Sequence, residues 1–235
     1  MPILDFELME NATPDPELLH SLRKLARGLS ALFWGLPAVL LISAETVRAE
    51  HLEPLEIAPA LAANLLLIFG VRQLGNFQKQ ERPWRLSLDR ARLVGLVNVG
   101  LCPFLFWYNR MPQENYFQVA VSSLVLSSVL FLFHLNIVLQ RLGAMLPDET
   151  LRQDINQFTA LNRALVIVWL VFVVTAVVLL QLADRPARLS PEMLAWLRQT
   201  VAIALLFLGL SPIAITMGLI WKTKEVIFDS VFGAK

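Results

Sequence analysis

Polar side chains within long apolar runs are the residues of this 235-residue chain best placed to do chemistry. His134 is the one Asp, Glu, Lys, Arg or His inside such a run, in the sequence F-L-F-H-L-N. A polar group in hydrocarbon is costly, so it marks either a functional path or a contact between helices. The candidate intramembrane polar site comprises Asn64, Asn98, Ser127, His134, Asn136 and Ser211.

Two interpretations of this polar set remain open. In the functional one, His134 relays protons or contacts a ligand, with Asn64 and Asn98 on neighbouring spans, and the Ser211-Pro212 break opens a binding site. In the structural one, a neutral imidazole is hydrogen-bonded to another helix and the proline only kinks its helix. We prefer the structural interpretation, because a coupled proton path needs a second titrating group and the apolar runs contain none.

A second candidate lies in the basic segment 78–92, where Arg82, Arg85 and Arg90 could bind a lipid phosphate. The alternative, which we prefer, is that these cations only fix the orientation of the protein in the membrane. No metal site or cofactor is predicted. The three histidines fall in different loops or spans, and there is one cysteine. No nucleotide, metalloprotease, hydrolase or redox motif occurs, so the sequence offers no catalytic residues and leans away from an enzyme.

The composition indicates that these side chains sit in a membrane protein. Hydrophobic residues make up 56% of the chain and charged residues 17%, with a mean hydropathy of +0.59. The net charge of +1 excludes a global field that would attract nucleic acid. A bilayer core needs roughly 17–25 apolar helical residues. We therefore predict an all-α fold with six transmembrane helices in three hairpins, at 28–44, 57–71, 93–108, 116–139, 164–182 and 201–221.

Charge placement predicts the orientation of the six spans. Fifteen of the twenty Lys and Arg residues fall in alternate connecting segments on one side, and such an excess is typical of the cytoplasmic side. Both termini are therefore expected in the cytoplasm and the protein in the plasma membrane, which is the inner membrane of a bacterium. Residues 1–15 form a predicted cytoplasmic segment, 16–221 the transmembrane domain and 222–235 a cytoplasmic tail.

Helical extensions into the cytoplasm are predicted at two places. Asp15-Pro16 is a helix start signal ahead of the first span. Before the fifth span, an apolar stripe at helical spacing follows Pro147-Asp148 and comprises Leu151, Ile155, Phe158 and Leu161. A stripe of this kind must be buried against something. Three alternatives remain open: it packs within the chain, lies on the membrane surface or docks a partner.

Three functional hypotheses follow. The first is a non-catalytic membrane subunit or scaffold that assembles with itself or with other membrane subunits, because the chain offers amphipathic extensions but no catalytic constellation. The second is a channel or transporter for a small neutral solute, which would use the candidate polar site. The third is a lipid-acting enzyme that would use the basic segment. Besides the lipid bilayer and membrane subunits, no nucleic acid or metal partner is expected.

Overall fold

The computed structural model describes residues 16–48, 57–77, 80–111, 113–145, 149–183 and 191–232. Within these residues the protein is all-α and contains seven helices. They are α2 (Pro16–Arg48), α3 (Ala58–Leu74), α4 (Arg82–Leu101), α5 (Pro103–Arg110), α6 (Asn115–Met145), α7 (Glu149–Ala183) and α8 (Pro191–Phe232). The predicted segment 1–15 lies outside the described residues. Most of the predicted tail 222–235 is helical, since α8 continues to Phe232.

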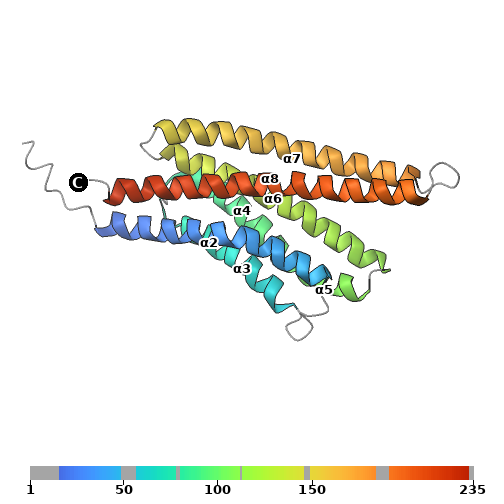
Figure 1. Cartoon of the computed structure of the whole chain (residues 1–235). Coiled ribbons are helices and arrows are strands. Elements are labelled where there is room, and N and C mark those ends of the chain that lie inside the picture. Colours follow the sequence, from blue (N-terminus) through green and yellow to red (C-terminus); the bar gives the residue numbers. More distant parts are fainter. Residues whose placement is uncertain are drawn as a thin grey trace, which may run out of the picture.

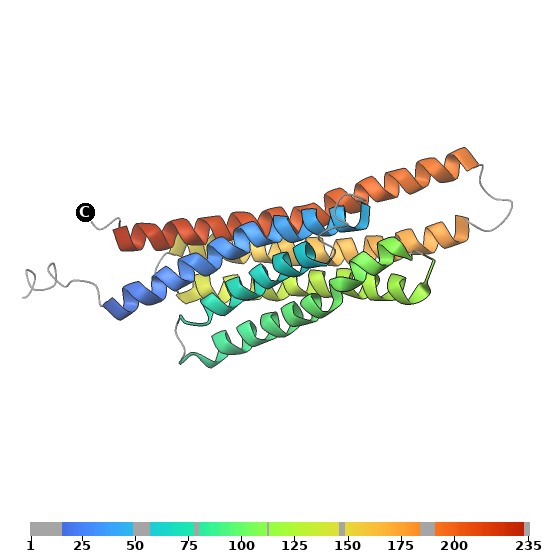
Figure 2. The same cartoon turned by 90° about the horizontal axis from the view of Figure 1, so that it is seen from below.

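The helices form one elongated bundle in which consecutive long helices run in opposite directions (Figures 1 and 2). The most extensive helix contacts join α2 with α3, α4 with α6, and α7 with α8. The beginning of α2 and the end of α8 lie at the same end of the bundle (Figure 1). We refer to this end as the terminal end.

Four helical stretches among the described residues are long and apolar enough to cross a membrane. They are His20–Val47, Arg82–Arg110, Asn115–Met145 and Arg152–Thr175. The α3 helix is apolar but has only 17 residues. These long apolar helices indicate an integral membrane protein, because in lipid a spanning segment must satisfy its own backbone hydrogen bonds.

Prolines account for the main helix boundaries. The expected start at Pro16 is confirmed, because proline suits the first helical turn, where its missing N–H costs no hydrogen bond. Pro103 separates α4 from α5, so the apolar run 93–108 is divided between two helices at Cys102. Pro37 and Pro212 lie inside continuous helices.

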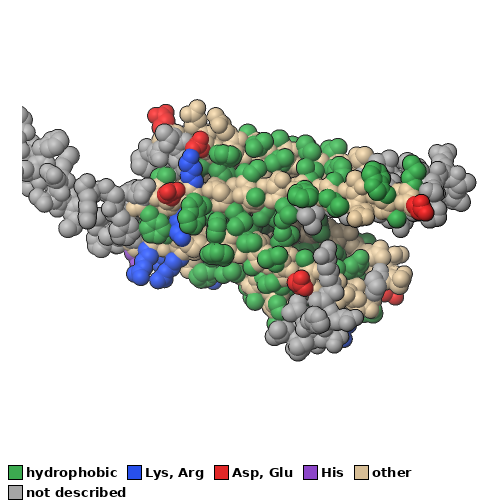
Figure 3. All heavy atoms as spheres, in the orientation of Figure 1, with side chains coloured by type: hydrophobic (Ala, Val, Ile, Leu, Met, Phe, Trp, Pro, Cys, Tyr) green, Lys and Arg blue, Asp and Glu red, His purple; other side chains and the backbone are tan. Residues whose placement is uncertain are grey.

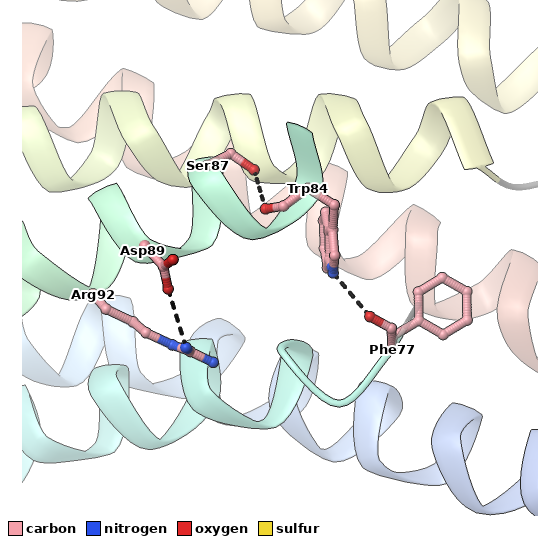
Figure 4. Close-up of polar contacts among 5 residues, drawn as sticks. All are labelled: Phe77, Trp84, Ser87, Asp89 and Arg92. Atoms are coloured by element: carbon pink, nitrogen blue, oxygen red, sulfur yellow. Dashed lines mark hydrogen bonds and ion pairs between the residues drawn. The ribbon is translucent and has the colours of Figure 1, made fainter. Parts of the chain in front are cut away.

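The basic segment differs from the expected connection. Residues 82–92 are helical and continue directly into the third apolar run. Trp84, Leu88 and Ala91 explain this difference, because they form an inward stripe on α4 and are at most 2% exposed. The indole Nε1 of Trp84 donates to the carbonyl oxygen of Phe77 at 3.0 Å, which ties the start of α4 to the residues just after α3 (Figure 4).

The predicted stripe ahead of the fifth span is divided by the fold. Ile155 is 1% exposed and lies against Gly143 of α6, so it belongs to the core rather than to a docking surface. Phe158 and Leu161 are exposed, and the side chain of Leu151 lies outside the described residues. Asp154 of α7 forms an ion pair with Lys222 of α8. The extension is therefore part of the helical bundle.

Close backbone approach holds α2 against α3. Gly28 faces Gly70, and a Cβ atom at Gly28 would lie 2.8 Å from the carbonyl oxygen of Gly70 and 2.9 Å from Cβ of Gln73. A Cβ atom at Gly70 would lie 2.7 Å from Cγ of Leu32. Small residues at such crossings allow dispersion contacts between helix backbones, which matter most where lipid removes the hydrophobic drive for association.

The substitution Gly28→Ala is expected to destabilise the bundle. Overpacking against the α3 backbone costs about 1–3 kcal/mol, which outweighs the gain of about 1 kcal/mol from the better helix former. The matched control is Gly218→Ala in α8, where a Cβ atom meets nothing within 4 Å. Unfolding by SDS in mild detergent, followed by circular dichroism, measures both. Equal or greater stability of Gly28→Ala would contradict the close crossing.

Candidate functional site

A groove lies on the outside of the bundle between α4 and α6. Its volume is about 370 Å³. The two helices run antiparallel (Figure 2), and each contributes one stripe of residues at helical spacing. The groove is lined from α4 by Arg82, Pro83, Leu86, Ser87 and Arg90, and from α6 by His134, Ile137 and Arg141.

The antiparallel arrangement produces two basic ends. Arg82 and Arg141 lie at the terminal end of the groove, near the first residues of α4 and the last of α6. Arg90 and His134 lie two helical turns further along the groove. Ser87 and Ile137 lie between the two ends. We call these the outer pair, Arg82 with Arg141, and the inner pair, Arg90 with His134.

The groove carries positive charge without a compensating acid. No Asp or Glu lines it, and Arg82, Arg90 and Arg141 form no ion pair with any described residue. All three arginines are exposed. Asp89 is adjacent to Arg90 in sequence, but its carboxylate pairs with Arg92 at 3.4 Å (Figure 4). The groove is therefore suited to an anion, because guanidinium groups bind phosphate oxygens through paired hydrogen bonds.

Beyond the inner pair, the same two stripes become apolar. On α4, Leu93 is 65% exposed and Val97 44% exposed. On α6, Leu130 and Leu126 occupy the matching positions and are 44% and 50% exposed. The surface between these helices thus changes from basic to apolar away from the terminal end, and we call the apolar part the apolar strip.

A separate polar cluster joins α6, α7 and α8. The Nδ2 atoms of Asn136 and Asn162 donate to the hydroxyl oxygen of Thr216 at 3.0 and 2.9 Å. The Thr216 hydroxyl donates in turn to the carbonyl oxygen of Pro212 at 2.7 Å. All three polar side chains are at most 4% exposed. Hydrogen bonds between spans of this kind fix which helix faces meet.

The amide orientations in this cluster follow from their other partners. Nδ2 of Asn136 lies 2.8 Å from the Leu132 carbonyl oxygen, and Nδ2 of Asn162 lies 3.3 Å from that of Pro212. Carbonyl oxygens only accept, so the amide nitrogens must face them. A small pocket beside the cluster is lined by both asparagines together with Phe133, Ile137, Thr159, Arg163 and Val166.

The six residues of the predicted polar site are distributed over the bundle. Asn136 belongs to the polar cluster, whereas His134 belongs to the groove. Asn64 donates to Ala60 O at 2.9 Å and Ser211 to Phe207 O at 2.9 Å, each within its own helix. Asn98 and Ser127 are buried on α4 and α6. None of the hydrogen bonds described joins two members of the set.

Only two of the three arginines predicted to bind a lipid phosphate lie together in the structure. Arg82 and Arg90 line the groove, but Arg85 does not. Sequence reasoning missed Arg141, Asn162 and Thr216. The signal for Arg141 is its spacing of seven residues from His134, which places both on one face of a helix. Asn162 lies just outside the apolar run 164–182.

No family model, curated protein or solved structure matches this chain.

Removal of the shared acceptor with Thr216→Val is expected to destabilise the protein by about 1 kcal/mol, because two amide groups lose their hydrogen bond to the same hydroxyl on α8. Thr223→Val is the matched control, since the buried Thr223 hydroxyl bonds only to Leu219 O within α8. SDS unfolding curves of the two variants provide the comparison. If both lose the same stability, the cluster does not link the helices.

Proposed function

We propose that the chain is a six-span membrane protein with three hairpins and both termini in the cytoplasm of a bacterial cell. The pairing of α2 with α3, α4 with α6, and α7 with α8 supports three hairpins. The excess of cations in alternate connecting segments supports the orientation. On the face seen in Figure 3, Lys and Arg side chains gather at the terminal end, and hydrophobic side chains cover the middle of the bundle.

Cysteine labelling tests this orientation. Cys102 is the only cysteine, so Cys102→Ser gives a background without thiols. In that background, Arg23→Cys and Glu114→Cys place single thiols at exposed positions, one near the start of α2 and one just before α6, and these two helices begin at opposite ends of the bundle (Figure 1). A membrane-impermeant maleimide applied to intact cells is expected to label Glu114→Cys only, and to label Arg23→Cys after the membrane is opened. The opposite pattern would contradict the orientation.

Within this topology, we propose that the protein binds the phosphate headgroup of an anionic phospholipid in the cytoplasmic leaflet. One observation carries the proposal: three exposed arginines line one groove, and none of its described lining residues is acidic. The cytoplasmic leaflet attracts basic groups near its surface by about 1 kcal/mol for each Lys or Arg. The apolar strip supports a lipid rather than a soluble anion, because it continues the groove in the direction that an acyl chain takes.

The third functional hypothesis is a lipid-acting enzyme. The present proposal keeps its lipid contact but does not include catalysis. The groove supplies phosphate binding, and among its lining residues no nucleophile is paired with a general base, since the Ser87 hydroxyl donates to a backbone carbonyl. The membrane-subunit hypothesis stays a prediction, with Phe158 and Leu161 as its exposed apolar residues. The solute-channel hypothesis also stays a prediction.

Binding of fluorescent phosphatidylglycerol to the purified protein in neutral detergent micelles tests the lipid proposal. The double variant Arg82→Gln, Arg141→Gln is expected to bind at least about 10-fold more weakly, because two contacts of about 1 kcal/mol each are lost. Arg85→Gln is the matched control, since Arg85 lies on the same helix outside the groove, and it should bind within about twofold of the wild type.

Two further arms identify the ligand. Phosphatidylcholine carries the same phosphate but no net charge, so it is expected to compete poorly. Inorganic phosphate lacks the acyl chains and should compete only at far higher concentrations. Competition by inorganic phosphate as strong as that by the lipid would show that the groove takes a soluble anion. An equal loss of binding in Arg85→Gln would contradict the groove as the site.

A further inference from the structure

We propose that the groove is a site for one phospholipid that carries two phosphate groups joined by a glycerol bridge, the headgroup of cardiolipin. This inference rests on the proposed function and specifies its ligand. It follows from the division of the positive charge into an outer pair and an inner pair at the two ends of one groove. Basic pockets between spans on the cytoplasmic side are suited to headgroups with several phosphates.

The length of the groove matches a headgroup longer than one phosphate. Arg82 and Arg90 are eight residues apart on α4, or about 12 Å along the helix axis. His134 and Arg141 are seven residues apart on α6, or about 10 Å. One phosphate contacts both ends only if the arginines of both extend fully toward the middle, whereas two phosphates held by a short bridge can place one phosphate near each end.

The charge of the groove also favours two phosphates. The three arginines give the groove three positive charges, and none of its described lining residues is an acid. A lipid with one phosphodiester would neutralise one of them and leave two unpaired guanidinium groups at the membrane interface. A lipid with two phosphodiesters leaves one. The second ionic contact forms within an already bound molecule, so it adds affinity at a high effective concentration.

The residues between the two ends fit the glycerol bridge. Ser87 is 7% exposed and donates its hydroxyl hydrogen to the carbonyl oxygen of Trp84 at 2.7 Å (Figure 4). Its oxygen therefore keeps lone pairs that can accept a hydrogen bond from the free hydroxyl of the bridging glycerol. Trp84 is fully buried, so this acceptor is held on a rigid part of α4. Ile137 provides the apolar wall opposite.

The apolar strip provides for the acyl chains of such a lipid. It is formed by two helices side by side, and its exposed members are Leu93 and Val97 on α4 with Leu126 and Leu130 on α6. The inner pair lies directly beside the apolar strip, so acyl chains can follow the strip while the bridged phosphates stay in the groove.

The test compares cardiolipin with phosphatidylglycerol at equal phosphate concentration, using the full-length protein in neutral detergent micelles. Wild-type protein is expected to bind cardiolipin at least about 10-fold more tightly. Arg90→Gln is the diagnostic variant, because it leaves the outer pair intact. It should lower the affinity for cardiolipin at least fivefold and the affinity for phosphatidylglycerol by a clearly smaller factor, so the preference for cardiolipin over phosphatidylglycerol falls.

Each outcome of this comparison decides one of the two claims. If the wild type binds the two lipids equally at equal phosphate, or Arg90→Gln weakens both alike, the groove holds a single phosphate. That result overturns the two-phosphate inference and leaves the proposed function standing. If neither lipid binds more tightly than phosphatidylcholine, the proposed function fails as well. The control variant Arg85→Gln must retain the wild-type preference, because otherwise the effect arises from the general charge of the surface.

Discussion

The bundle depends on close contact between helices for which lipid supplies no hydrophobic drive. Where Gly28 faces Gly70, the backbones of α2 and α3 approach so closely that a Cβ atom does not fit. Gly143 gives Ile155 the same access to α6. At such crossings, dispersion between closely packed atoms provides the association that exclusion of water provides in a soluble protein. The buried hydrogen bonds to Thr216 fix how the helices are rotated toward one another, because each asparagine must reach the same hydroxyl.

The same constraint explains where the groove can form. Charge is costly inside the bundle, and the buried polar side chains described there are amides and hydroxyls rather than charged groups. The outer stripes of α4 and α6 are free of this restriction, so arginines can stand on them near the terminal end while leucines and valines occupy them further along. A surface that changes in this way from basic to apolar is complementary to an anionic phospholipid, whose negative headgroup leads into apolar acyl chains.

The parts of the fold that depend on one helix could be predicted from the sequence. Pro16 predicts the start of α2. Four of the six apolar runs lie within long helices, the run 57–71 corresponds to the shorter α3, and the run 93–108 is divided at Pro103, a proline that the sequence marks. The missed features depend on contacts between helices. Residues 82–92 look like a charged loop until Trp84 and Leu88 are seen to be buried. Arg141 lines the groove with Arg82 only because α4 and α6 are antiparallel. Thr216 joins three helices only because two asparagines from other helices converge on it.

Native mass spectrometry of the protein purified from its membrane in mild detergent tests the central claim most directly. The account predicts that the wild-type chain retains an anionic phospholipid as a resolved mass increment. It also predicts that the variant with Arg82→Gln, Arg90→Gln and Arg141→Gln loses this lipid, whereas Arg85→Gln keeps it. Wild-type protein without bound lipid, or a triple variant that retains the same anionic lipid, would contradict the assignment of the groove between α4 and α6.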